Sequence, residues 1–155
     1  MVEDARLPME SIVEELLGLH PNDWWLAQQI TKTILRLAAI GRVIMVGRGA
    51  EVITQLLPDV LHVRLVAPLS KRITHAEEFY GLSASGTTMK VSEEDHARRR
   101  YLRRYFDADC DNPLLYHLVI NTAKTGLAGA AETIVEAALR KHRDCLQLQN
   151  KARAA

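Results

Sequence analysis

The 155 residues are enough for one compact domain, and the 48% apolar and 25% charged residues are typical of a folded globular protein. This composition excludes a collagen-like or wholly disordered chain. Lysine and arginine number 20 against 19 acidic residues, a net charge of +1. Any anion binding must therefore come from local clustering, and we expect no nucleic-acid partner.

Cysteine usage and the N-terminus indicate the cellular compartment. Cys110 and Cys145 form neither a disulfide framework nor a CxxC pair, which favours a reducing environment. No apolar run reaches the roughly 18 residues of a membrane-spanning helix, and the acidic pair Glu3-Asp4 does not resemble a signal peptide. We expect a cytoplasmic protein with no membrane partner.

The N-terminal third predicts two helices and a strand. Apolar residues at helical spacing over 9–18 indicate the first helix, and Asn22 is the expected N-cap of a second helix that runs to about Ala39. Gly41 ends it. The apolar run 43–46 then predicts a short buried strand, of the kind found in parallel sheets covered on both faces.

Helix and strand continue to alternate in the middle of the chain. A short helix is expected over 51–57, a buried strand over 61–66 and a helix from Pro68 to about Gly81. This alternation is typical of right-handed crossover units in a doubly wound sheet.

The region after Gly81 has a different composition. Residues 81–91 are small and polar, which predicts a mobile connection. A capping-box-like run that starts at Ser92 predicts the next helix, and the breaker 111–113 follows it.

The C-terminal part predicts a third strand over 118–121 and a final helix over about 127–145. The fold class is therefore α/β, a three-layer arrangement of a short parallel sheet with helices on both faces. We expect one domain over 1–146 with a lid-like region at 81–110, and a polar, fraying tail over 147–155.

An arginine-rich helix is the strongest local feature. Its arginines alternate with two tyrosines: Arg98, Arg99, Arg100, Arg103, Arg104, Tyr101 and Tyr105. Guanidinium groups at this density suit phosphate oxygens. The alternative is a solvated basic face, neutralised in part by an Asp95–Arg99 pair at i,i+4 and by Asp107 and Asp109. The sequence leaves both interpretations open.

A second candidate site follows the strand predicted over 43–46. Ligands of open α/β sheets bind at the carboxyl ends of strands, where Gly47-Arg48-Gly49 is expected to lie. A tight turn explains the same glycines. No GxxxxGK[ST] or HExxH motif occurs, and the histidines are scattered, so we predict no metal site and no confident catalytic residue.

Four ordered motifs carry a resemblance to a known family. They are Ile40 to Ala50 (IGRVIMVGRGA), His62 to Arg72 (HVRLVAPLSKR), Asp95-x-x-Arg98-x-x-Tyr101, and Tyr116 to Thr122 (YHLVINT). Together, over roughly residues 10–140, they resemble the cytidylate kinase-like family of P-loop nucleoside monophosphate kinases.

The resemblance implies a function and a set of site residues. Members resemble cytidylate kinase, in which ATP donates its γ-phosphoryl group to a nucleoside monophosphate with Mg²⁺ between the phosphates. ATP and Mg²⁺ are implied by the family alone. Arg48 matches the arginine that faces the acceptor nucleotide, and Arg72 matches the arginine that opens a helix. Asp95 and Arg98 match the lid motif, and Arg99 extends the expected phosphate-binding set.

The sequence also departs from the family pattern. No strand and glycine-rich P-loop precede residue 10, Gly49 stands where an Asp is usual, and His117 replaces another Asp. The resemblance therefore implies a partial P-loop-kinase-like fold: the acceptor and lid part of an ATP-dependent kinase, inactive alone, that binds a nucleotide or another phosphorylated small molecule. The alternative is a non-catalytic oligomeric binding or assembly protein.

A missing P-loop strand would leave the centre of the sheet open. The strands expected over 43–46 and 61–66 must then pair directly, or another polypeptide must fill the gap. We therefore expect a homo-oligomer or a partner chain.

Overall fold

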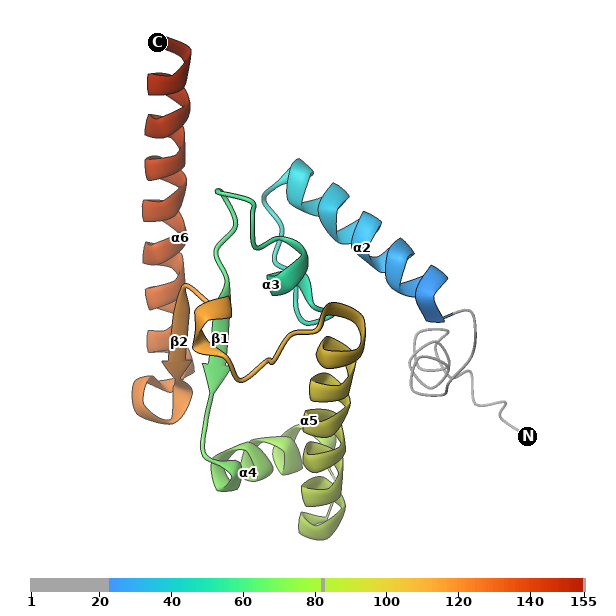
Figure 1. Cartoon of the computed structure of the whole chain (residues 1–155). Helices are drawn as coiled ribbons and strands as arrows, with labels where there is room; N and C mark the ends of the chain where they lie inside the picture. The colour runs from blue at the N-terminus through green and yellow to red at the C-terminus, as the bar shows by residue number, and fades with distance from the viewer. Residues whose placement is uncertain (1–22, 82, 155) are drawn as a thin grey trace, which may run out of the picture. The chain divides into compact units, whose positions relative to one another are not determined.

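The structure, a computed structural model, describes residues 23–81 and 83–154 (Figure 1). The chain divides into two compact units, Met1–Arg48 and Gly49–Ala155. The helix expected over 9–18 and the cap expected at Asn22 lie outside the described residues. In the part that the structure describes, no helix is both long enough and apolar enough to cross a membrane.

The described part of the first unit consists of helix α2, Asp23–Ile40, and the segment after it. Gly41 ends the helix as predicted, with φ at +71° and its N–H donating to the carbonyl of Leu37 at 3.1 Å. The strand predicted over 43–46 is wrong: these residues form no strand, and Ile44 is 92% exposed. Apolar composition alone does not make a strand, because its backbone needs a neighbour with which to pair.

The second unit contains a parallel sheet of two short strands, β1 (Val63–Val66) and β2 (Leu118–Asn121). They are in register from Val63 opposite Leu118 to Val66 opposite Asn121. The α/β class and the short parallel sheet are thereby confirmed. Successive side chains point to opposite faces of a strand, so Arg64 lies on one face and Leu65 on the other.

Helix α6, Thr122–Ala154, packs against both strands of the sheet. Its first residues are separated from the rest by a kink at Gly126, whose φ and ψ are 71° and 169°. Ala130 and Cys145 are buried, at 2% and 7% exposure. The polar segment expected to fray over 147–155 continues α6 as far as Ala154, since no glycine or proline follows Gly129 to end the helix, and its fraying stays a prediction.

Helices α4 (Leu69–Tyr80) and α5 (Ala84–Phe106) pack against each other (Figure 1). The mobile connection predicted over 81–91 is wrong, because α5 begins at Ala84. Ser83 caps it by accepting a hydrogen bond from the N–H of Gly86. Thr87 and Val91, four residues apart, are buried on one side of the helix, and this packing outweighs the local composition.

The short helix α3, Ala50–Ile53, begins next to the end of α5. Its N-cap Gly49 has φ at +71°, and a Cβ atom built there would lie 2.6 Å from the ring of Phe106. Glycine is therefore required at this position for both its backbone and its packing. A 3₁₀ helix, η1 (Pro113–Leu115), precedes β2.

Candidate functional site

Charged side chains from β1, α4, α5 and the loop before η1 form one cluster in the second unit. We call this set the arginine–aspartate cluster: Arg64, Arg72, Asp95, Arg98, Arg99 and Asp111. The position of each residue in its helix or strand brings it to the cluster. α4 begins directly after Pro68, which places Arg72 in its first turns, while Asp95, Arg98 and Arg99 follow one another along one stretch of α5.

The pair Arg72–Asp95 joins α4 to α5. The two terminal nitrogens of Arg72 donate to the two carboxylate oxygens of Asp95 at 2.9 and 2.8 Å, a bidentate geometry. These hydrogen bonds lower the pKa of Asp95 from its ordinary value. Arg98 approaches the same carboxylate less closely, at 3.9 Å. Asp95 is thus charged and oriented at neutral pH.

Asp111 forms the second centre of the cluster. Arg64 from β1 donates to one of its oxygens, and Nε of Arg99 donates to the other at 3.0 Å. The hydrogen bond from Arg64, followed by that from Arg99, lowers the pKa of Asp111. Arg99 also acts electrostatically on Asp95, so the two centres belong to one network.

The cluster has more positive than negative charge. Four guanidinium groups face two carboxylates, and the side chains of Arg98 and Arg99 are 62% and 51% exposed. Among the residues described, the contact of Arg98 with Asp95 is long for a hydrogen bond, which leaves its donors available. A compact anion with several acceptor oxygens, such as a phosphate group, matches this arrangement.

The expected phosphate-binding residues are therefore partly brought together. Arg72, Asp95, Arg98 and Arg99 lie in the cluster. Arg48 ends the first unit, with φ at 59°, and its role stays a prediction. The expected Asp95–Arg99 ion pair is replaced by an Arg99–Asp111 pair, because Asp95 points its two oxygens at α4.

Sequence reasoning missed Arg64 and Asp111. A signal for Arg64 is present, since a charge inside the apolar strand sequence LHVRLV needs a buried or half-buried partner. Arg64 also donates to the carbonyl oxygen of Cys110, to which the Tyr116 hydroxyl donates at 3.0 Å. The loop that carries Asp111 is thus fixed to β1.

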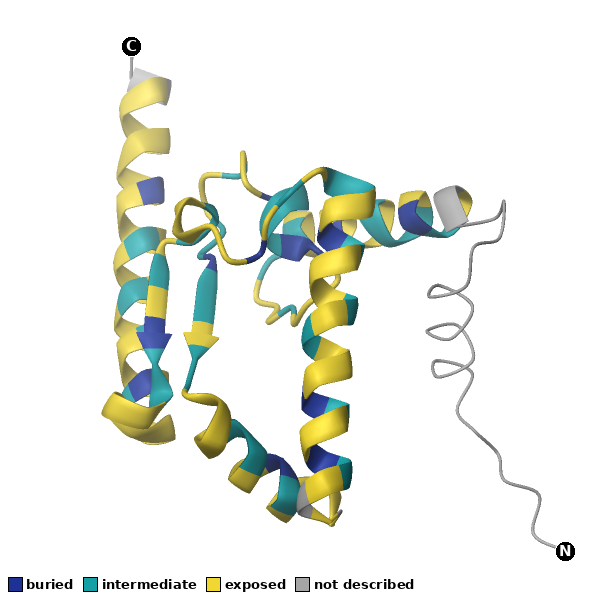
Figure 2. Ribbon diagram, turned by 60° about the horizontal axis from the view of Figure 1, so that its bottom comes forward, coloured by how far each residue is buried: buried dark blue, intermediate teal, exposed yellow. Residues whose placement is uncertain are grey.

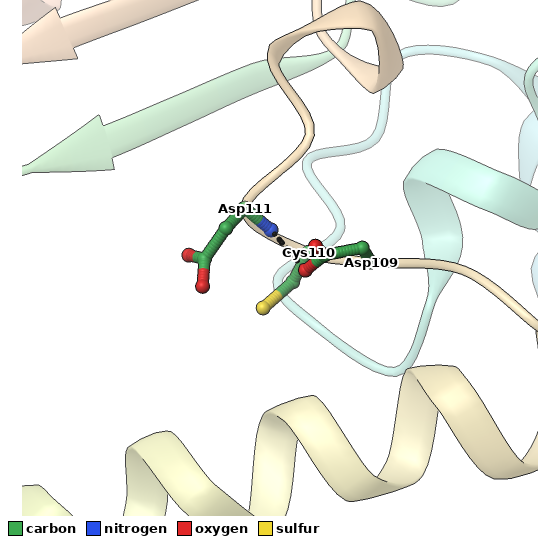
Figure 3. A group of neighbouring side chains, drawn as sticks. All are labelled: Asp109, Cys110 and Asp111. Carbon is green, nitrogen blue, oxygen red and sulfur yellow. Dashed lines mark hydrogen bonds between the residues drawn. The ribbon is translucent and has the colours of Figure 1, made fainter.

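The same loop brings Asp109, Cys110 and Asp111 close enough to suggest a metal site (Figure 3). Asp109 accepts a hydrogen bond from the backbone N–H of Asp111 at 2.9 Å. Both oxygens of Asp111 are engaged by arginines, and burial raises the pKa of the Cys110 thiol. A protonated thiol and a paired carboxylate are poor ligands, so this group serves the loop structure.

The arginine–aspartate cluster does not fit Mg²⁺, which the family resemblance implies together with ATP. Mg²⁺ at phosphoryl-transfer sites is held by carboxylate and phosphate oxygens. The carboxylates of Asp95 and Asp111 are occupied by arginines, and no GxxxxGK[ST] motif is present in the 155 residues.

A second polar group surrounds the buried His62, just before β1. The hydroxyl of Thr54 donates to the carbonyl of Ala50 at 2.6 Å, so Nε2 of His62 must donate to Thr54 at 2.9 Å. The backbone N–H of His62 donates to Nδ1 of His117, and Lys141 lies 3.0 Å from the other ring nitrogen of His117. Burial lowers the pKa of both histidines.

Comparisons with known proteins identify relatives of this chain. A uronate isomerase from Corynebacterium glutamicum is 28% identical to this chain over 117 residues. The match covers 76% of this chain and 22% of that protein, so the chain spans under a quarter of this relative.

A solved structure has a similar fold. The crystal structure of an uncharacterized protein from Eubacterium ventriosum matches with a TM-score of 0.64 and 17% identity, over 86% of this chain and 68% of that one. The likeness shows that the two chains share a fold. Residues 10–124 match the cytidylate kinase-like family. Because this match covers most of the sequence, the chain belongs to the cytidylate kinase-like family.

Proposed function

We propose that this chain binds the phosphate group of a nucleoside monophosphate at the arginine–aspartate cluster and does not transfer a phosphoryl group by itself. The observation that carries the proposal is the surplus of guanidinium groups around Asp95 and Asp111, with Arg98 and Arg99 half exposed beside them. Family membership supports a nucleotide as the source of that phosphate.

Each residue of the cluster has a distinct part in the proposed binding. Arg98 and Arg99 supply exposed donors to the phosphate oxygens. Asp95 holds Arg72 in a fixed orientation, and Asp111 does the same for Arg64. Donors fixed in advance lose less entropy when an anion arrives, which favours binding of a compact, highly charged group.

Titration calorimetry with CMP tests the site. Replacing Arg98 by Ala should weaken CMP binding by about 1.5–3 kcal/mol, the usual worth of a hydrogen bond to a charged group. Arg100→Ala is the matched control: it removes the same charge from α5, two residues and about 200° of helix rotation away. Equal losses in both variants would reduce the site to a diffuse basic surface.

A phosphoryl-transfer assay tests the second half of the proposal. We expect no Mg²⁺-dependent conversion of CMP to CDP by the purified chain with ATP, because a Walker lysine and hydroxyl normally hold the donor phosphates. Conversion that disappears in Arg98→Ala would refute this part and leave the binding proposal intact.

The second candidate is a non-catalytic assembly protein. It is favoured by the sheet, in which β1 pairs with β2 alone among the residues that the structure describes. The other backbone edge of β1 is a position at which a further strand can add. Failure of CMP to bind, together with stable association in solution, would favour this candidate.

Two cysteines that are free and buried are consistent with a reducing, cytoplasmic location for either function.

A further inference from the structure

Helix α6 has an exposed apolar row that its contacts with the sheet do not use. Val135, Leu139 and Leu146 are 56%, 59% and 45% exposed. Spacings of four and seven residues place them on one side of the helix. Figure 2 shows α6 exposed over most of its length, with only short buried segments.

The row lies on a different side from the residues that α6 buries. Ala130 and Cys145 are buried, and they lie about 80–140° around the helix from Val135, at 3.6 residues per turn. Single exposed leucines are ordinary on a protein surface. A row aligned over three turns of one helix is instead the pattern by which helices recognise helices. His142 lies on the same side between Leu139 and Leu146, and its Nδ1 is 3.4 Å from a carboxylate oxygen of Asp59, so the apolar positions flank this polar contact.

Charges beside the row specify the direction of a partner helix. Glu136 and Arg143 are seven residues apart, so they flank the row on the same side. Near the row, Glu132 and Glu136 precede Leu139, whereas Arg140 and Arg143 follow it. Neither Glu136 nor Arg143 has an ion pair among the residues described.

We propose that a second copy of this chain packs its α6 antiparallel against the row formed by Val135, Leu139 and Leu146. A twofold axis near Leu139 places Val135 of each copy near the partner's Leu146 and brings Glu136 opposite the partner's Arg143. The charge pair then forms twice. A parallel twofold pairing would instead place the two Glu136 side chains on opposite flanks of the seam, where neither meets an arginine of the partner.

The part of α6 that carries the row is long enough for such an interface, although the row itself spans about 17 Å at 1.5 Å per residue. Residues 128–149 of α6 extend for roughly 33 Å at 1.5 Å per residue, comparable with the helix pairs of small bundles. The inference does not rest on the proposed phosphate site, since no residue of the arginine–aspartate cluster lies in α6.

Sedimentation equilibrium of the whole chain tests the proposal. The wild type at micromolar concentration should have twice the monomer mass of 17.4 kDa. Leu139→Glu should raise the dissociation constant by about a hundredfold or more, because each dimer contains the change twice. Leu148→Glu is the matched control, a leucine of the same helix that is 65% exposed but lies on the opposite side from Leu139.

A charge exchange tests the direction and remains informative if Leu139→Glu fails to fold. Glu136→Arg should weaken the dimer by about tenfold, and the double variant Glu136→Arg, Arg143→Glu should restore it. A wild-type monomer would overturn the proposal. So would a dimer whose affinity is the same in Leu139→Glu and Leu148→Glu, or one that the double exchange does not restore.

Discussion

The α4–α5 pair and the sheet with α6 belong to the same compact unit, but different interactions hold them together. α4 and α5 are joined by the bidentate Arg72–Asp95 pair, and α5 has only a few buried side chains, among them Thr87 and Val91. The sheet and α6 are held by backbone pairing, by the buried Ile120, Ala130 and Cys145, and by the neutral His62.

This difference follows from what each region is proposed to do. Charges that bind a phosphate must stay accessible to it, so they cannot be replaced by a dry apolar interface. The α4–α5 pair therefore depends on ion pairs that a ligand can supplement. Beside the strands, Arg64 is paired with Asp111 and Lys141 lies against His117, and the sheet region relies mainly on backbone pairing and burial.

The largest expected effect is at the point where α5 meets α3. Gly49→Ala should lower the free energy of unfolding by about 2–4 kcal/mol, because its Cβ would collide with Phe106 and its φ is positive. Gly81→Ala, where φ is +63° and no atom lies within 4 Å, should cost about 1 kcal/mol. Urea unfolding of both variants measures the difference, and equal losses would mean that packing at Gly49 is loose.

Removing the ion pair tests the α4–α5 interface itself. Arg72→Ala should lower the free energy of unfolding by about 1–2 kcal/mol, because Asp95 loses both of its close hydrogen bonds. Lys71→Ala, an exposed cation of the same helix, should change stability by less than about 0.5 kcal/mol.

Acid titration sharpens this prediction. The pKa of Asp95 is lowered in the folded state. Its contribution to the free energy of unfolding is therefore fully present above the unfolded-state pKa of 3.8, and it is lost as the pH falls below that value. Arg72→Ala should lose most of that dependence. If Arg72→Ala loses as much stability at acid pH as the wild type does, other groups hold the Asp95 carboxylate.

A smaller gain in stability is expected at Thr87. Its side chain is fully buried, and its hydroxyl has no hydrogen-bond partner among the residues described. Thr87→Val removes the unsatisfied group at nearly constant volume and should stabilise the protein by about 1 kcal/mol. Thr74→Val, at an exposed position of α4, should be close to neutral. A destabilised Thr87→Val protein would indicate that the hydroxyl has a partner.

The smallest effect, expected in the sheet region, is a pH dependence in a different window. Burial lowers the folded-state pKa of His62 and of His117, and Lys141 adds to both shifts. The unfolded state therefore binds protons first, and stability should fall as the pH drops below 6.5. His62→Gln keeps a donor for Thr54 and should reduce this slope between pH 8 and 5, whereas Arg72→Ala should leave it unchanged. Chemical unfolding midpoints across that range provide the measurement.

Elements with strong local signals could be predicted from the sequence. Pro68 and Gly81 bound α4 because one starts a helix and the other ends it in a left-handed conformation. β2 is predicted at its observed bounds, since its apolar residues follow a turn and precede a helix. Four ordered motifs were also sufficient to indicate the family, which the comparison then matched over residues 10–124.

The sequence predicted a flexible segment at 81–91 and a strand at 43–46, and both were decided by packing. Thr87 and Val91 make the first segment helical because they are buried on one side of α5. Residues 43–46 have strand composition, but no described strand pairs with them. The composition of a segment indicates which secondary structures it can form. The elements that pack against it or pair with it determine which one it adopts.

By itself, the sequence determined the class of the fold, the family, and the concentration of arginine after Asp95. Only the tertiary structure decided which carboxylate each arginine meets: Asp95 turned to Arg72 on α4, and Asp111, sixteen residues further along, met Arg99 and Arg64. The physical reason is that an ion pair depends on distance in space, and the bends at Gly81 and after Phe106 set that distance through the arrangement of α4, α5 and β1.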